Sequence, residues 1–260
     1  MRRPLIALSL ALVLALAPPA APALAAPTAA PQKTVGQAQL PARYADKLRR
    51  FETEVRRQME LDRTTGLTIG FVKDGAAWVK GFGYADLENR TPMKAESAYR
   101  LASVTKPMTA IAVLQLAEQG KLDLDAEVQT YVPYFPKKKW PVTVRQLLGH
   151  LGGIPHYVNR EAELRIKTRK TTRESIAIFE NYDLVAEPGT RYSYSSYGYN
   201  LLGAVVEAAS GRSYGDYMRE HVWRPLGMGD TRMDDPVEII PNRVRGYQMV
   251  DGRVANSEFV

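Results

Sequence analysis

The stretch Tyr99-Arg100-Leu101-Ala102-Ser103-Val104-Thr105-Lys106-Pro107 decides how the fold and the chemistry are interpreted. It predicts a few extended residues that turn into a helix, with a serine at the turn and a lysine three residues later. Residues three apart on a helix share a face, so the Lys106 amine can lie beside the Ser103 hydroxyl. A serine hydroxyl is a weak nucleophile unless an adjacent base takes its proton, and a partly desolvated lysine can do so. The N–H groups and the dipole at the helix N-terminus favour negative charge at the same place.

Composition limits the class of protein. The chain has 260 residues, of which 45% are hydrophobic and 24% charged, as expected for one large globular domain or two small ones. The formal net charge of +7 is modest and no RNP or zinc-finger pattern accompanies it, so we expect no nucleic-acid partner. The absence of cysteine excludes disulfides, thiolate nucleophiles and lipid attachment through a cysteine.

The first 25 residues have the pattern of a signal peptide. Met1-Arg2-Arg3 is a small basic region, and the apolar run from Leu5 to Ala17 is too short to span a bilayer comfortably. Ala23-Leu24-Ala25 predicts cleavage after Ala25 and a periplasmic or extracellular protein, with an uncleaved membrane anchor as the alternative. Residues 26–41 are rich in alanine and proline and are predicted to be a linker. Residues 42–260 are then predicted to form one folded domain.

Helices and strands are predicted in the first half from periodicity. Apolar residues recur at spacings of three and four over residues 42–60, which predicts an amphipathic helix. Residues 67–72 and 76–82 are strand-like, and Asp74-Gly75 between them is a hairpin signal. Apolar positions after Ser103 predict a helix that ends at Gly120.

The second half is predicted to be mainly helical, with a strand pair at its end. The expected elements are a short helix over 143–148, a helix from a Thr171-x-x-Glu174 capping box to about residue 180, helices over 197–209 and 213–223, and a strand over 243–250 that turns at Asp251-Gly252. Helices in the middle, with strands before and after them, predict a mixed α+β fold with a largely antiparallel sheet.

Two serine patterns compete for the role of nucleophile. Ser-x-x-Lys at Ser103 is expected by chance about once in a chain of this composition, so it needs support. Gly211-Arg212-Ser213-Tyr214-Gly215 matches Gly-x-Ser-x-Gly, which in α/β-hydrolases requires a strand before the serine and a helix after it. A helix is predicted before Ser213, so Ser213 is interpreted as a helix N-cap, and an α/β-hydrolase site there is the alternative.

A cluster of tyrosines and the three histidines are the other candidate groups. One phenol of the run from Tyr192 to Tyr199 could lie beside Ser103 and Lys106, where a cation would stabilise its anion for acid or base catalysis. Equally, these tyrosines could form an amphipathic surface or core edge. His150, His156 and His221 come without a His-x-x-x-His pair, so no metal site is predicted, and the first two are interpreted as loop or core-edge residues.

Several further segments carry patterns that belong together. In chain order they are Gly81 to Asp86, Tyr99 to Lys106, Val142 to His150, Glu187 to Ser195, Gly198 to Gly203, and Pro225-Leu226-Gly227-Met228. With this order and spacing, the chain from about Leu67 onward resembles the serine β-lactamase and penicillin-binding protein superfamily, specifically its class C and D-alanyl-D-alanine carboxypeptidase branch. The resemblance implies an antiparallel sheet flanked by helices and a mainly helical region.

The resemblance also implies roles for four residues and no cofactor. Ser103 would be the acylated nucleophile and Lys106 its general base. Tyr194 begins the Tyr-x-Asn motif of the family and would be the second general acid/base, while Ser196 at the third position would bind substrate. A serine hydroxyl has a shorter reach than an asparagine amide, so Ser196 argues against efficient β-lactam hydrolysis and fits an esterase or a peptidase-like member equally well.

The third motif of the family, Lys/His-Thr/Ser-Gly on a late strand, does not occur before Val260. Members of the family also carry further strands and a C-terminal helix, so we expect the chain to be incomplete at its C-terminus. The oxyanion hole would pair the Ser103 N–H with an N–H of that late strand. Loss of one such donor costs about 2.7–4 kcal/mol of transition-state stabilisation.

The residues and the resemblance together predict a secreted serine hydrolase. It would form an acyl-enzyme on a D-Ala-D-Ala-type amide, a β-lactam or a small ester. The alternatives are a catalytically impaired or non-catalytic binding or scaffold protein on the same fold, and an esterase without β-lactamase activity. The expected partner is a small-molecule or peptide substrate, with cell-wall peptidoglycan as a candidate, and the sequence leaves the oligomeric state open.

Overall fold

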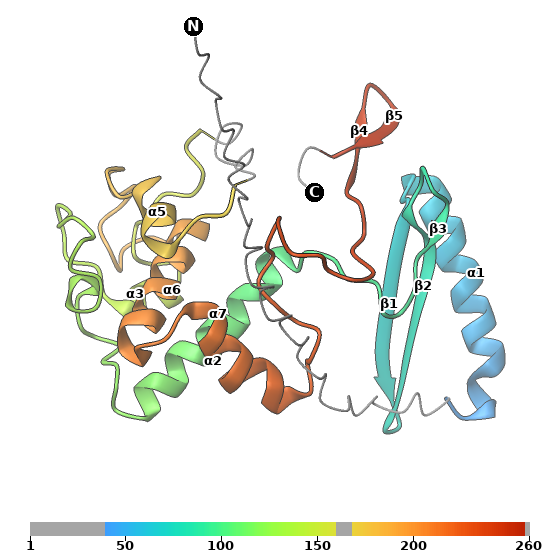
Figure 1. Cartoon of the computed structure of the whole chain (residues 1–260), viewed down its shortest axis with the longest axis horizontal. Coiled ribbons are helices and arrows are strands. Elements are labelled where there is room, and N and C mark those ends of the chain that lie inside the picture. The colour runs from blue at the N-terminus through green and yellow to red at the C-terminus, as the bar shows by residue number, and fades with distance from the viewer. Residues whose placement is uncertain (1–39, 160–167, 258–260) are drawn as a thin grey trace, which may run out of the picture. The chain divides into compact units, whose positions relative to one another are not determined.

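The structure is a computed structural model whose described residues are 40–159 and 168–257 (Figure 1). The predicted signal peptide, and the predicted linker except for its last two residues, lie outside the described residues. Among the described residues, no helix combines the length and the apolar character that a bilayer span requires.

An antiparallel hairpin forms the larger sheet. Strand β1 (Gly66–Lys73) pairs with β2 (Ala76–Asp86), and the short β3 (Thr91–Pro92) pairs with the far end of β2. The turn residues Asp74 and Gly75 both have positive φ, at 52° and 74°. Two such residues make the turn whose twist matches that of paired strands, which confirms the predicted hairpin.

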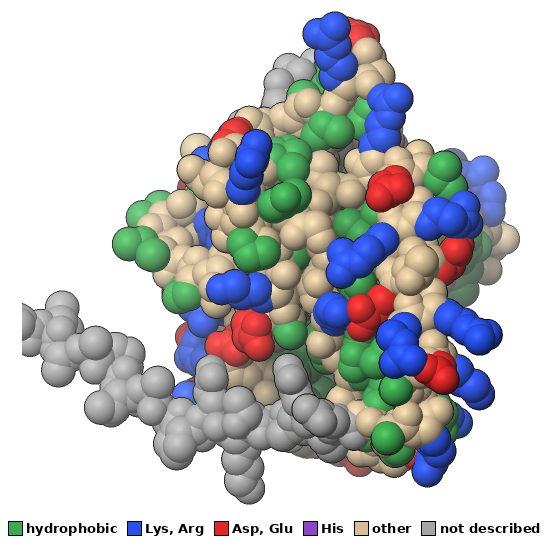
Figure 2. All heavy atoms as spheres, turned by 90° about the vertical axis from the view of Figure 1, so that its right-hand side faces the viewer, with side chains coloured by type: hydrophobic (Ala, Val, Ile, Leu, Met, Phe, Trp, Pro, Cys, Tyr) green, Lys and Arg blue, Asp and Glu red, His purple; other side chains and the backbone are tan. Residues whose placement is uncertain are grey.

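Helix α1 (Ala45–Asp62), which follows a short 3-10 turn η1 (Ala42–Tyr44), packs beside this hairpin (Figure 1). The Phe51 ring lies edge-on to Phe71 of β1 and Trp78 of β2, with centroid distances of 6.1 and 6.0 Å. The outward face of α1 carries alternating charges joined in ion pairs such as Arg57 with Glu54. Figure 2 shows acidic side chains interspersed among the basic ones on this side of the molecule.

The main hydrophobic core lies in the helical region, where α2 (Thr105–Glu118) packs against α6 (Ser196–Ser210). Fully buried residues of α2 and α6 include Ala112, Val113, Leu116, Leu201 and Leu202. Around them lie the 3-10 turn η3 (Val128–Thr130) and the helices α3 (Val144–Leu148), α5 (Thr172–Ala177) and α7 (Tyr214–Tyr217). Because α6 packs against α2, the residues that directly precede α6 are held near the start of α2.

Local capping signals set several of these helix ends. The capping box between Thr171 and Glu174 is present as predicted, but α5 ends at Ala177 and not near residue 180. Beyond Ala177 the chain continues as turns, in which the Phe179 and Glu180 N–H groups both bond to the Ile176 carbonyl. After α7, the predicted helix continues as a π-helical segment η4 (Met218–Trp223) and a 3-10 turn η5 (Arg224–Leu226).

The C-terminal strand pair is shorter than predicted. Strands β4 (Tyr247–Val250) and β5 (Arg253–Asn256) form an antiparallel hairpin that turns at Asp251-Gly252, as expected. The predicted strand over 243–246 does not form there, because Val244 N–H bonds to Ala98 O and Arg245 N–H to Ala85 O, both at 2.9 Å. The α+β fold class, with antiparallel strand pairs and helices, is confirmed.

Candidate active site

Ser103 lies in a single 3-10 turn, η2 (Ala102–Val104), that runs directly into α2. The predicted helix therefore starts at this serine, which is exposed, but the residues directly before it are not extended, since Leu101 has φ −79° and ψ −11°. The preceding residue, Ala102, has a φ of +45°. Residues with a Cβ adopt this left-handed conformation at a cost of about 1–2 kcal/mol, so the turn that presents Ser103 is strained.

Replacing Ala102 by glycine is expected to raise the free energy of unfolding by about 1 kcal/mol, because glycine adopts positive φ without a Cβ clash. Urea denaturation followed by tryptophan fluorescence measures the change. Ala117→Gly is the control, since Ala117 lies within α2 and its replacement is expected to lower stability by about 1 kcal/mol. Destabilisation of similar size by both variants would contradict strain at Ala102.

The four residues predicted for the site lie together in the structure. The Tyr194 hydroxyl donates to Ser103 Oγ at 2.7 Å. Lys106 Nζ donates to Ser103 Oγ and to Ser196 Oγ, both at 3.2 Å. Ser103 Oγ is thus within hydrogen-bond distance of two groups that can take and return a proton, which is the geometry that nucleophilic catalysis requires.

The start of α6 positions Tyr194 and Ser196. The N-cap residue Ser195 is buried, accepts the Gly198 N–H at 2.9 Å and donates to Pro155 O at 2.8 Å. A capped and buried helix start has a fixed backbone direction. Tyr194 and Ser196, one on each side of the cap, therefore face the beginning of α2.

The Lys106 ammonium controls the electrostatics of Tyr194. Lys106 Nζ lies 4.8 Å from the centroid of the Tyr194 ring. Hydrogen bonding with Lys106, and then with Ser103, lowers the pKa of the Tyr194 phenol below its ordinary value. A phenol with a lowered pKa forms its anion at lower pH and is a better general base near neutrality.

A cleft of about 1350 Å³ opens beside Ser103, Lys106 and Ser196. Tyrosines and charged side chains make up much of its walls. Among them are Tyr134, Tyr157, Tyr199, Tyr214, Arg100, Arg169, Arg173, Asp234 and Asp235. Arg100 is bound to Asp234, Arg169 to Asp235 and Arg173 to Glu180. These three cations of the cleft wall are therefore already compensated by carboxylates of the chain.

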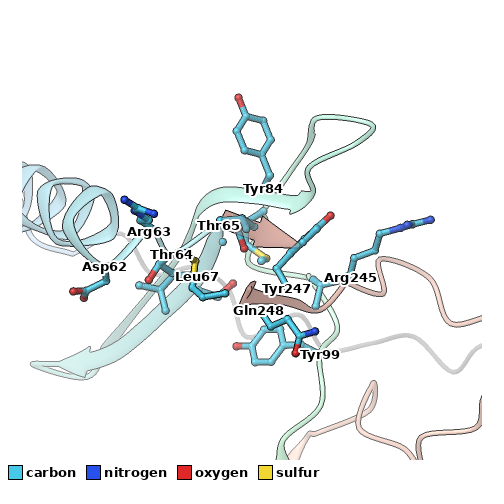
Figure 3. Close-up of a pocket in the computed structure, with 16 residues that line it drawn as sticks. Asp62, Arg63, Thr64, Thr65, Leu67, Tyr84, Tyr99, Arg245, Tyr247 and Gln248 are labelled. Atoms are coloured by element: carbon cyan, nitrogen blue, oxygen red, sulfur yellow. The ribbon is translucent and has the colours of Figure 1, made fainter. Parts of the chain in front are cut away.

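A second cavity, of about 480 Å³, lies between the start of β1 and the β4–β5 hairpin (Figure 3). Tyr84, Tyr99 and Tyr247 contribute to its wall, and the Tyr247 hydroxyl accepts the Leu87 N–H at 2.7 Å. The described residues that line this cavity include no serine, lysine or histidine. The pairing of a nucleophile with a base therefore belongs to the cleft and not to this cavity.

Ser213 is a helix cap, as interpreted from the sequence. Its side chain accepts the Asp216 N–H at 3.1 Å and donates to Asp216 Oδ2 at 2.6 Å. Helix α6 precedes it and ends at Gly211, whose φ is +68°. The strand that a nucleophile elbow requires is absent at this position, so the α/β-hydrolase alternative is wrong.

Sequence reasoning missed the relation of two histidines to the site. His150 and His156 lie in the loop after α3, but their rings contact Tyr194, with centroid distances of 4.5 and 5.6 Å. No rule of sequence spacing connects this loop to a residue some 40 positions later. The positive φ of His150, +57°, describes its backbone and gives no sequence signal of the ring contact with Tyr194. Among the described residues, no group of three His, Asp or Glu side chains is arranged to hold a metal ion.

Comparison with known proteins agrees with this fold. Residues 51–258 match the family model described as Beta-lactamase. The serine beta-lactamase-like protein LACTB, mitochondrial, of Homo sapiens is 33% identical over 70% of this chain and 46% of its own length. Among solved structures, the octameric penicillin-binding protein homologue from Pyrococcus abyssi has a TM-score of 0.71 and 33% identity, covering 80% of this chain and 50% of that chain.

A third relative is EstCE1, a hydrolase with promiscuous acyltransferase activity, with a TM-score of 0.69 and 27% identity, covering 82% of this chain and 60% of that chain. The fold and the matches define the class, which is the serine β-lactamase and penicillin-binding protein superfamily. Within it, the chain belongs to the beta-lactamase family of serine hydrolases. The chain spans about half the length of the relatives it matches.

Proposed function

We propose that the protein hydrolyses its substrate through an acyl-enzyme on Ser103. The observation that carries this proposal is the position of Ser103 Oγ, which lies 2.7 Å from the Tyr194 hydroxyl and 3.2 Å from Lys106 Nζ. A serine whose only role was to stabilise a turn would not need hydrogen bonds from the Tyr194 hydroxyl and Lys106 Nζ. The convergence of the Lys106 amino group, a phenol of lowered pKa and an exposed hydroxyl on one cleft supports catalysis.

The chemistry would proceed in two steps with a balanced proton path. Ser103 Oγ attacks the substrate carbonyl and its proton passes to the Lys106–Tyr194 pair, which then protonates the leaving alcohol or amine. Water attacks the resulting acyl-serine, gives a proton to the same pair, and that proton returns to Ser103. The positive end of α2 and the Ser103 N–H stabilise the oxyanion in both steps.

We infer that a small ester is the preferred substrate. Ser196 stands where the family motif has an asparagine whose amide could contact a substrate amide, and its shorter reach supports an ester. EstCE1, a similar hydrolase, has acyltransferase activity. A D-Ala-D-Ala-type amide and a β-lactam are the competing substrates, and export by the predicted signal peptide would place the site near peptidoglycan.

Covalent labelling tests the proposal on the unmodified chain. A fluorophosphonate probe is expected to attach to Ser103, and mass spectrometry of the digested protein locates the adduct. Protection from labelling by a p-nitrophenyl ester, a D-Ala-D-Ala peptide or nitrocefin then ranks the substrate classes. An adduct at another serine would assign the nucleophile to that serine, whereas no adduct on folded protein would favour a non-catalytic binding protein.

A further inference from the structure

Two histidines of one loop bind consecutive backbone N–H groups beside Tyr194. His150 Nδ1 accepts the Ser195 N–H at 3.1 Å, and His156 Nδ1 accepts the Ser196 N–H at 3.2 Å. These are the two residues that follow Tyr194 in the chain. The loop therefore fixes the backbone on the C-terminal side of Tyr194 through two imidazole nitrogens.

The rings and the backbone of this loop also contact the segment around Tyr194. The His150 ring lies 4.5 Å from the Tyr194 ring, with an interplanar angle of 37°, and the His156 ring is edge-on to it at 5.6 Å. The His150 carbonyl accepts the Ser193 N–H at 2.9 Å. Residues 193, 195 and 196 are thus all bound by the loop, and Tyr194 is held among them.

An imidazole nitrogen accepts a hydrogen bond only while it carries no proton. We propose that His150 and His156 are positioning residues that hold Tyr194 against Ser103, and that protonation of His150 Nδ1 weakens this hold. That protonation would turn an acceptor into a donor that faces a backbone N–H. The inference rests on the proposed function, because it concerns the orientation of the general acid/base.

The surroundings of His150 favour its neutral form. Lys106 of α2, His156 of the same loop, Tyr192 and Tyr194 before α6, and Tyr199 of α6 all face it. Burial, then the charge of Lys106, then His156 lower the pKa of His150 below its ordinary value. The neutral form therefore contributes stability that is fully present above the ordinary histidine pKa and is lost as pH falls through the lowered value.

The test measures fluorophosphonate labelling rates from about pH 5 to pH 9. The wild-type rate is expected to fall in acid. His150→Gly accepts the positive φ but lacks the acceptor, so labelling at the upper pH is expected to be slower by about tenfold. His150→Asn restores an acceptor oxygen, tolerates the same φ and does not titrate, so it is expected to recover most of that loss.

The double variant His150→Asn/His156→Asn separates the two histidines from other titrating groups. In this variant, the fall of the labelling rate in acid is expected to occur at a pH at least about one unit lower than in wild type. His221→Asn is the control: His221 contacts Tyr217, and this variant is expected to keep the wild-type pH profile. An unchanged acid limb in the double variant, or wild-type labelling by His150→Gly, would overturn the proposal.

Backbone NMR distinguishes failure of this inference from failure of the proposed function. In Ser103→Ala, which cannot be labelled, the amide protons of Ser195 and Ser196 are expected to shift together with the histidine titration, and not to shift in the double variant. If wild type does not label but these amides titrate, the function is wrong and the positioning contact holds. If the amides do not respond to histidine protonation, the positioning role is wrong.

Discussion

Ser103→Ala is expected to lower the rate of p-nitrophenyl ester hydrolysis by at least about 10⁴-fold and to abolish covalent labelling, because it removes the atom that is acylated in the proposed mechanism. The hydroxyl is exposed, and its hydrogen bonds come from Tyr194 and Lys106, which remain solvated without it. The thermal midpoint is therefore expected to change little. Initial rates and a melting curve on the same sample measure the two effects.

Ser213→Ala is the matched control for Ser103→Ala. Both serines lie at helix starts and both stand in known hydrolase patterns, but Ser213 caps α7 through Asp216. Its replacement is expected to cost about 1 kcal/mol of stability and to leave esterase activity close to wild type. Loss of activity in Ser213→Ala together with full activity in Ser103→Ala would reverse the assignment of the nucleophile.

Lys106→Met is expected to lower kcat by about 10²–10⁴-fold, the range for loss of general acid/base catalysis. Methionine keeps an unbranched apolar chain at this position and removes the ammonium that contacts Ser103 and Ser196. Because Lys106 is the largest cause of the lowered pKa of Tyr194, that pKa is expected to rise in the variant. The pH range over which the remaining activity increases should therefore lie at higher pH than in wild type.

A pH profile of kcat/KM for wild type and Lys106→Met measures this shift. Lys121→Met, just beyond the end of α2 and exposed, is the control for loss of one positive charge. Its profile is expected to match that of wild type. A lower rate for Lys106→Met without displacement of the profile would show that Lys106 orients Ser103 without controlling Tyr194.

Elements whose cause is local were predictable from the sequence. The hairpins at Asp74-Gly75 and Asp251-Gly252, the capping box at Thr171 and the cap at Ser213 all depend on residues no more than three positions apart. The predicted strand boundary failed where distant residues took part: β4 starts at Tyr247, and the N–H groups of residues 244 and 245 bond to Ala98 and Ala85. The predicted end of α5 was about three residues too late, since turns follow Ala177.

For the candidate site, the sequence by itself determined the pair Ser103 and Lys106, because one helical turn places residues three apart on one face. Their residue types and spacing already contained the chemistry of a nucleophile and a base. The residues alone left open whether a tyrosine would join them, and only the resemblance to a family singled out Tyr194.

Only the tertiary structure decided which groups surround Ser103. Tyr194 lies 91 positions away, and packing of α6 against α2 brings it to 2.7 Å. The same packing places His150 and His156 against the backbone of Ser195 and Ser196, a contact that no periodicity encodes. The spacing of residues along the chain determines which side chains meet within one helix. Contacts between distant segments depend on how the buried side chains pack, and sequence spacing does not reveal that packing.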